Sequence, residues 1–266
     1  MATGKGKKRI ILGLGGKGGT GKTLFCRLLY YCLVDNGLNV LGLDADIENP
    51  EFFQYHQEVE GYEVQQLEFL EVGYAKDFFT QLKDDNPDAA LLDMPGASSE
   101  ATRDQIDRFG LFDIAADLGY RVTIVAVLNN GYPAIASLAA MMEHCGEQAD
   151  YVVVRSELWN QGSLNYSRWD DSETRQQFKE LKGIEISMPV LEISTFDVMH
   201  EAAVSFFKVA ELPYGDQLLA DSFVSRGRLQ IRQAGSYFGL SEPERDEPAK
   251  AGKAGKTKAG TETVAA

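Results

Sequence analysis

A short glycine-rich segment carries the residues and the spacing needed to hold a chain of phosphates. Residues 16–23, with the sequence GKGGTGKT, fit the pattern GxxxxGK[ST]. Glycines let backbone N–H groups wrap closely around phosphate oxygens, and a lysine followed by a hydroxyl completes such a loop. We expect Lys22 to reach the outer phosphates and the hydroxyl of Thr23 to bind Mg²⁺. The residues predicted to bind a nucleoside triphosphate are Gly16, Lys17, Gly18, Gly19, Thr20, Gly21, Lys22 and Thr23.

Three aspartates follow apolar runs farther along the chain. Residues 40–43 are followed by Asp44 and Asp46, and residues 89–92 are followed by Asp93. In a parallel sheet these aspartates would lie at the edge where open α/β folds bind their ligands. Mg²⁺ is usually held by few carboxylates together with water and phosphate oxygens, which aspartates at such an edge can provide. The alternative for a single aspartate at a strand end is a helix cap or a turn.

The elements that must position these groups alternate between strand-like and helix-like patterns. Apolar residues recur at helical spacing over residues 23–36 and 134–144, and Gly37 stands where the first of these helices would end. This alternation predicts an α/β fold, with a mostly parallel sheet covered by helices on both faces. The predicted buried strands are residues 10–14, 40–43, 89–92, 122–128 and 151–154.

The pattern becomes less regular after residue 156. Residues 172–182 and 197–210 have helical patterns, residues 184–191 look extended, and residues 215–237 have room for one or two helices. From residue 241 onward the chain has no aromatic residue and is rich in Lys, Ala, Gly and Thr, which predicts a disordered tail. The predicted organisation is a basic flexible N-terminus at 1–8, one ATPase domain at 9–240 and the tail at 241–266.

Composition narrows the class of protein. The formal net charge of −14 argues against a surface coated with positive charge, although a local basic patch remains open. The three cysteines, Cys26, Cys32 and Cys145, form no CxxC pair and predict buried thiols in a reducing compartment. No stretch approaches the roughly 18 apolar residues of a membrane span, and the basic N-terminus lacks the apolar run of a signal peptide. We therefore expect a cytoplasmic protein with no membrane partner.

The phosphate loop also matches a narrower pattern. Residues 17–23 fit KGGxGK[ST], the deviant Walker A motif, and the chain therefore resembles the ParA/MinD superfamily of P-loop ATPases that dimerise on binding ATP. In that family the first lysine of the motif reaches across the dimer to the partner's nucleotide, and this role falls on Lys17. The resemblance implies a P-loop NTPase fold, ATP with Mg²⁺ as cofactors, and a homodimer in the ATP state.

The resemblance also implies roles for the aspartates. Asp44 and Asp46 are similar to the family's DxD element, whose second aspartate is associated with magnesium and the hydrolytic water, so Asp46 takes that role. Asp44 would support the loop, and Asp93, at the end of a strand similar to Walker B, would hold a water bound to magnesium. Lys17, Lys22 and Asp46 are thus the expected catalytic residues, and Thr23, Asp46 and Asp93 the expected metal-site residues.

The chain departs from the family at two places. The family often continues its DxD element as DxDPQ, whereas residues 46–50 have the sequence DIENP. Relatives often place an asparagine after a late strand to contact adenine, whereas this strand ends in Arg155. Among the branches, the chain looks most similar to plasmid-partition ParA proteins and to the TraL-, MobD- and StbB-like proteins of conjugative and mobilisable plasmids.

These observations favour an ATP-dependent dimerising switch ATPase that acts in plasmid partition or in conjugative transfer and mobilisation. Its candidate partners are a partition or mobilisation protein and DNA bound without sequence preference. Arg226, Arg228 and Arg232 form the candidate DNA contact, with a solvated helix face as the alternative. Two other functions stay open: a metabolic P-loop phosphotransferase, and a nucleotide-binding module with little hydrolysis.

Overall fold

A single parallel sheet organises the chain. The computed structural model describes residues 6–16, 19–71, 73, 75–129, 131–157 and 166–241. Seven strands pair in the order β3-β2-β4-β1-β5-β6-β7, and every pairing is parallel. The strands are β1 (Lys8–Gly15), β2 (Val40–Asp44), β3 (Val64–Gln66), β4 (Ala89–Asp93), β5 (Tyr120–Leu128), β6 (Ala149–Ser156) and β7 (Ile184–Met188). The predicted α/β fold with a parallel sheet is therefore confirmed.

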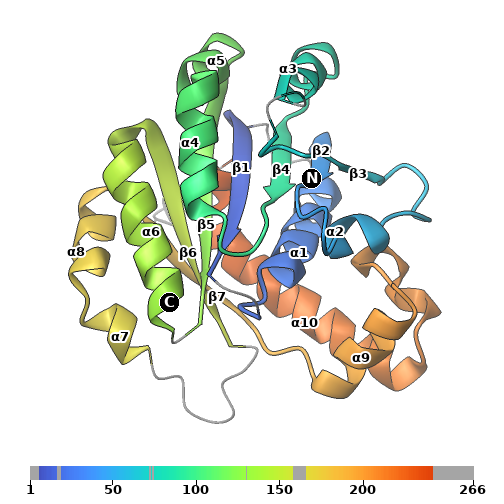
Figure 1. The fold of residues 1–266 in the computed structure, drawn as a ribbon. Helices are drawn as coiled ribbons and strands as arrows, with labels where there is room; N and C mark the ends of the chain where they lie inside the picture. Colours follow the sequence, from blue (N-terminus) through green and yellow to red (C-terminus); the bar gives the residue numbers. More distant parts are fainter. Residues whose placement is uncertain are drawn as a thin grey trace, which may run out of the picture.

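Helices cover both faces of the sheet (Figure 1). On one face lie α3 (Ala75–Asp84), α4 (Ser99–Phe109), α5 (Leu111–Asp117), α6 (Tyr132–Cys145), α7 (Ser167–Asp170) and α8 (Glu173–Glu180). On the other lie α1 (Lys22–Asp35), α2 (Glu51–Gln54), α9 (Ile193–Glu201), the 3₁₀ helix η2 (Phe206–Glu211) and α10 (Tyr214–Gln233). Two further 3₁₀ helices are η1 (Gly146–Gln148) and η3 (Gly235–Phe238).

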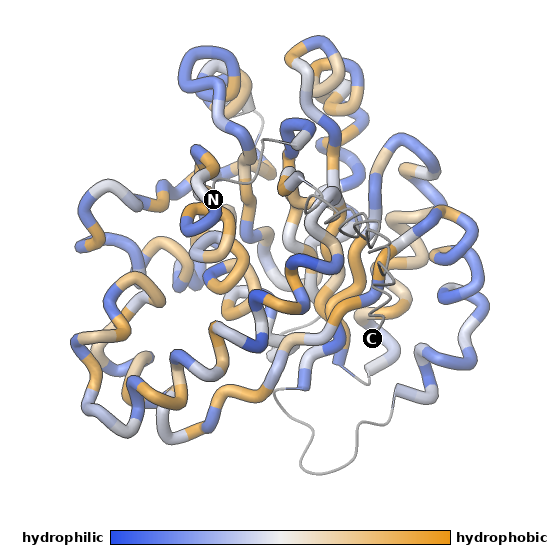
Figure 2. The backbone as a smooth tube through the Cα atoms, turned by 180° about the vertical axis from the view of Figure 1, so that it is seen from behind, coloured by the Kyte–Doolittle hydropathy of each residue, from blue (hydrophilic) through white to orange (hydrophobic). Residues whose placement is uncertain are grey.

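The central strand shows why these apolar runs become parallel strands. In β1 the side chains of Ile10 and Leu12 belong to one hydrophobic core and that of Ile11 belongs to the other, and all three are fully buried. A strand covered on both faces must be apolar at successive positions, which explains the unbroken runs in the sequence. Figure 2 shows the hydrophobic colour concentrated in the central strands, with hydrophilic segments toward the periphery.

Two of the less regular segments differ from expectation. Residues 197–210 do not form one helix, because α9 ends at Glu201 and Ala203 adopts a positive φ of 47° before η2 begins at Phe206. This break lets Val204, Phe206 and Val209 turn into the core beside α1. The extended segment expected at 184–191 is a strand only as far as Met188, since proline follows at position 189 and cannot donate a ladder hydrogen bond.

The described chain begins at residue 6, just before β1, and extends to Ser241 after η3. Residues 6–8 of the predicted flexible N-terminus are described, and Lys8 begins β1. The predicted tail lies outside the described residues beyond Ser241. All three thiols are free and buried. Of the helices that the structure describes, none combines the length and apolar composition needed to cross a membrane.

Candidate nucleotide-binding site

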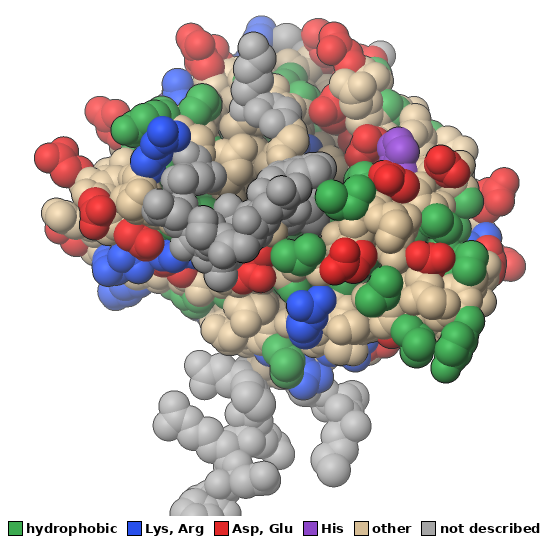
Figure 3. All heavy atoms as spheres, turned by 90° about the horizontal axis from the view of Figure 1, so that it is seen from below, with side chains coloured by type: hydrophobic (Ala, Val, Ile, Leu, Met, Phe, Trp, Pro, Cys, Tyr) green, Lys and Arg blue, Asp and Glu red, His purple; other side chains and the backbone are tan. Residues whose placement is uncertain are grey.

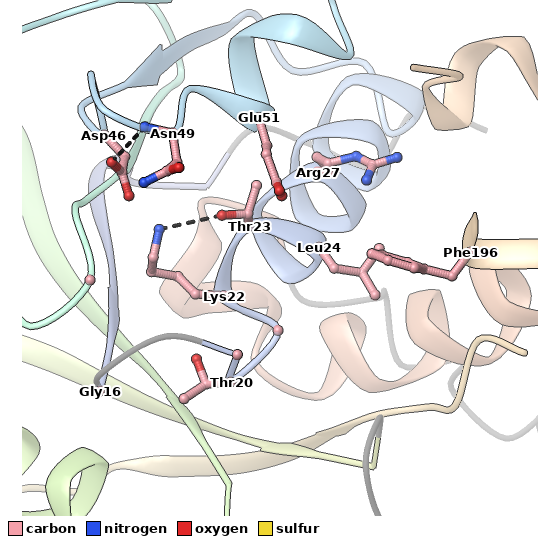
Figure 4. A pocket seen from close by; sticks show the side chains of 13 residues that line it. Gly16, Thr20, Lys22, Thr23, Leu24, Arg27, Asp46, Asn49, Glu51 and Phe196 are labelled. Atoms are coloured by element: carbon pink, nitrogen blue, oxygen red, sulfur yellow. Dashed lines mark hydrogen bonds between the residues drawn. The ribbon is translucent and has the colours of Figure 1, made fainter. Parts of the chain in front are cut away.

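A pocket of about 330 Å³ lies at the carboxyl edge of the sheet, where the loop after β1 enters α1 (Figure 4). The loops that follow β2 and β4, together with α2 and α9, complete its walls. The described residues that line it are Gly16, Gly19, Thr20, Gly21, Lys22, Thr23, Leu24, Arg27, Asp46, Asn49, Glu51, Gly96 and Phe196. The structure thus brings together the predicted phosphate loop and the aspartate that follows β2.

The loop backbone has the form of an anion site. Gly19 and Gly21 adopt positive φ values of 78° and 87°, a conformation that residues with a side chain rarely adopt. Helix α1 begins at Lys22 without a side-chain cap, so its first N–H groups and its dipole are presented to the pocket. Such a terminus favours phosphate. Lys17 and Gly18 lie outside the described residues.

The Lys22 ammonium is paired with the Asp93 carboxylate at the base of the pocket. Both residues are buried, and Lys22 also lies 3.5 Å from the Thr23 hydroxyl. Burial acts to lower the pKa of Lys22, but the charges of Asp93 and Asp46 outweigh it and raise the pKa above its usual value. Lys22 therefore remains charged, and its present partner is a carboxylate on the neighbouring strand.

Asp44 organises the loop that carries Asp46. Its carboxylate is fully buried and accepts the backbone N–H of Asp46 at 3.0 Å and of Phe53 at 2.9 Å. Burial and the nearby charge of Asp93 raise the pKa of Asp44 to about 7, although these hydrogen bonds act against that rise. Asp44 thus supports the loop after β2, in agreement with the supporting role that the resemblance implied.

Asp46 is half-buried and lines the pocket, and its carboxylate accepts the backbone N–H of Asn49 at 3.1 Å. Asp44 and Asp93 are register partners on adjacent strands, which places the ends of β2 and β4 side by side. Asp93 lies beneath Lys22 rather than on the pocket wall. The oxygen atoms of Thr23 and Asp46 suit Mg²⁺, which takes few protein ligands alongside phosphate and water. No three His, Cys, Asp or Glu side chains in the described part of the chain gather closely enough to hold a metal alone.

Four pocket residues were not foreseen: Arg27, Asn49, Glu51 and Phe196. Arg27 follows Thr23 by one helical turn, a spacing that could have indicated the same face of α1. Asn49 and Glu51 belong to the segment after Asp46, where the chain departs from DxDPQ. Phe196 comes from α9, far away in sequence, and no local pattern points to it.

Arg27 is buried beside the pocket without a carboxylate partner among the described residues. Its guanidinium stacks 3.2 Å from the ring centre of Tyr55 and donates to the carbonyl of Val204 at 3.2 Å. Desolvation lowers the pKa of Arg27 to about 10, so the group stays cationic near neutral pH. Arg27 thereby joins α1 to the α2 and η2 regions behind the pocket.

The three candidate DNA-binding arginines lie on α10, away from the pocket. Arg228 pairs with Asp35 at 2.6 Å, and Arg226 donates to the carbonyl of Val190 at 3.0 Å. Arg226 and Arg228 are about 160° apart around the helix, since each residue turns about 100°. Only Arg226 and Arg232 are exposed, so the described cluster is not one continuous cationic surface. Figure 3, a view onto the carboxyl edge of the sheet, shows acidic side chains distributed around that face.

Comparisons with known proteins agree with this architecture. The chain is similar in structure to the cell division ATPase MinD of Pyrococcus furiosus, with 15% identity over 85% of this chain and 99% of that one and a TM-score of 0.50. The septum site-determining protein MinD of Pyrococcus horikoshii OT3 with Mg-ADP is also similar, with 14% identity over 86% of this chain and 97% of that one and a TM-score of 0.49. A Cyanothece McdA variant with ATP has 15% identity over 84% of this chain and 97% of that one and a TM-score of 0.46.

Because the sequence identities are 14–15%, the structural similarity shows a shared fold and nothing about activity. No curated protein matches the chain significantly. The model of the CobQ/CobB/MinD/ParA nucleotide-binding domain matches residues 11–203, which is more than half of the chain. The phosphate loop, β2 and β4 with their aspartates, and six of the seven strands fall within that range. The chain therefore belongs to the CobQ/CobB/MinD/ParA nucleotide-binding domain family.

Proposed function

We propose that this protein is an ATP-dependent switch ATPase of the ParA type, which dimerises when it binds ATP with Mg²⁺ and separates after slow hydrolysis. One observation carries the proposal. Lys22, Thr23 and Asp46 line a single pocket at the uncapped start of α1, and Lys22 is tied to Asp93 at its base. This set provides a cation, a hydroxyl and carboxylates around a backbone that favours phosphate.

The pairing of Lys22 with Asp93 suggests how nucleotide binding proceeds. The incoming phosphates compete with Asp93 for the Lys22 ammonium, and charge-assisted hydrogen bonds to phosphate oxygens replace the ion pair. Asp93 is then available to hold a water of the metal. Because Lys22 is buried and charged in either arrangement, its exchange of partners adds little desolvation cost.

In the proposed hydrolysis, the protein acts mainly by position and charge. Lys22 and the loop N–H groups stabilise charge on the transferred phosphoryl group, and Asp46 positions the attacking water. Thr23 and Asp46 would hold Mg²⁺, which neutralises phosphate charge when bound. Lys17 would contact the nucleotide of the second subunit, as the deviant Walker A resemblance implies.

The proposed output is timed binding of a partner in the cytoplasm, in plasmid partition or in conjugative transfer and mobilisation. The resemblance to TraL-, MobD- and StbB-like proteins supports this assignment. A partition or mobilisation protein is the proposed protein partner. The exposed Arg226 and Arg232 make DNA a second proposed partner of the dimer.

The test measures turnover and assembly together. We expect the purified chain to hydrolyse ATP slowly, to be dimeric by light scattering with ATP and Mg²⁺, and to be monomeric with ADP. Lys22→Ala should show neither property. Rapid turnover that depends on a small-molecule acceptor would identify a phosphotransferase instead. Nucleotide binding without turnover, even with partner candidates present, would identify a binding module.

A further inference from the structure

The carboxylate of Glu51 stands in the phosphate pocket at a place where a nucleotide would bring more negative charge. Glu51 is the first residue of α2, is half-buried and lines the pocket with Asp46. Figure 4 shows the Glu51 side chain extending from α2 toward the Thr23 side chain. Two carboxylates, from Asp46 and Glu51, therefore approach the position where the Thr23 hydroxyl would hold a metal.

The backbone around Glu51 is anchored on several sides. Its N–H donates to the carbonyl of Asn49 at 2.8 Å, and the N–H of Phe53 is held by the buried Asp44 carboxylate. At the end of α2, the Tyr55 hydroxyl forms a 2.9 Å hydrogen bond with His200 of α9. These contacts fix the backbone of α2, and therefore the position from which the Glu51 side chain enters the pocket.

Glu51 has no ion-pair partner among the described residues. Its carboxylate forms no hydrogen bond or ion pair within the described part of the chain. The charge of Glu51 acts on Arg27, whose pKa it helps to raise against desolvation, while the guanidinium itself stacks on Tyr55 and donates to the carbonyl of Val204. Lys22 is engaged with Asp93. Glu51 thus adds a negative charge, which Arg27 offsets only from beyond ion-pair distance, to a pocket built for an anion.

We propose that Glu51 makes this pocket selective for metal-complexed nucleotide over metal-free nucleotide. The inference rests on the proposed function, since it assumes that phosphates occupy the pocket. Like charges at close range in a partly buried site repel, so a nucleotide without a divalent cation is disfavoured by Asp46 and Glu51 together. When Mg²⁺ accompanies the phosphates, the same carboxylates face a cation, through water or directly, and the repulsion becomes attraction.

The experiment compares the affinity for ADP with Mg²⁺ and with EDTA, by isothermal titration of the full chain. Glu51→Gln keeps the shape of the side chain and removes its charge. We expect it to tighten binding of metal-free ADP, to weaken or leave unchanged binding of Mg-ADP, and so to reduce the Mg²⁺ preference roughly tenfold. The matched control is Glu48→Gln, because Glu48 is exposed in the same loop and is not among the described residues that line the pocket.

Three outcomes would overturn the inference. One is an unchanged ratio of the two affinities in Glu51→Gln. Another is an equal loss of both affinities, which would mark Glu51 as structural. The third is an equal change in Glu48→Gln, which would show that only the net charge of the loop matters. Failure of the wild-type chain to bind ADP in either form would instead contradict the proposed function, so the two failures are distinguishable.

Discussion

Lys22 at the start of α1 and Asp93 at the end of β4 form a buried ion pair at the base of the phosphate pocket. Neither residue forms a second ion pair among the described residues. The pair therefore links the stability of the free protein to the residues proposed to bind the nucleotide.

Replacing Lys22 with alanine should affect both stability and binding. The buried Asp93 carboxylate would lose its cation, which should lower the free energy of unfolding by about 3–5 kcal/mol. Nucleotide binding should be lost, as measured by isothermal titration. The double variant Lys22→Ala with Asp93→Asn should regain much of the stability without regaining binding. Unchanged nucleotide affinity in Lys22→Ala would rule out the phosphate-loop assignment.

Asp46→Ala should separate binding from hydrolysis. Asp46 lines the pocket but is not paired with Lys22, so its loss should leave the nucleotide bound. The rate of phosphate release should fall at least about 100-fold if Asp46 positions the attacking water. Light scattering should then show a dimer that persists with ATP. Hydrolysis at the wild-type rate would mean that another group positions the water.

Asp44 predicts a pH dependence of stability. Its pKa is about 7 in the folded protein, well above the ordinary value of 3.8, so the folded state holds this proton more tightly than the unfolded state does. The associated stability is full below pH 3.8 and is lost as the pH rises through about 7. Between pH 5 and pH 8 the contribution should fall by about 2–3 kcal/mol.

Denaturant unfolding of wild type and Asp44→Asn at pH 5 and at pH 8 measures the stability that Asp44 contributes. The asparagine variant should not show this fall, because its amide stays neutral at both pH values. Wild type should therefore lose about 2–3 kcal/mol of stability relative to the variant between pH 5 and pH 8. A difference independent of pH would show that Asp44 keeps an ordinary pKa.

The proposed DNA binding predicts a specific dependence of affinity on salt concentration. Arg226 and Arg232 are exposed, whereas Arg228 is paired with Asp35. A dimer would offer about four exposed arginines that have no carboxylate partner among the described residues, so the logarithm of affinity for a random duplex should fall with log salt at a slope of about −4. Binding should require ATP and be lost when Arg226, Arg228 and Arg232 are all replaced by alanine.

A matched variant sharpens the DNA test. Asp35→Asn frees Arg228 without touching the arginines, and should steepen the salt slope by about two in the dimer. Equal binding by wild type and the triple alanine variant would assign DNA to another surface. Absence of binding by both at low salt would leave a protein partner as the output of the switch.

The phosphate loop, the strand-end aspartates and the class of fold were accessible from sequence because each has a local cause. The loop needs glycines, a lysine and a hydroxyl at fixed spacing within residues 16–23, and parallel strands buried on both faces need unbroken apolar runs. Chain geometry then places the aspartates after β2 and β4 at the same edge as that loop. The supporting role of Asp44 was implied by the resemblance of residues 44–46 to the DxD element, and not by spacing alone.

Only the tertiary structure determines which charged residues form ion pairs with one another. The sequence does not show that Lys22 pairs with Asp93, 71 positions away, or that Asp35 takes up Arg228, because these contacts depend on strand order and helix packing. The same holds for Phe196, which reaches the pocket because α9 packs into the same core as α1. Local spacing specifies elements and loops, whereas long-range pairing is specified by the common core that those elements must bury.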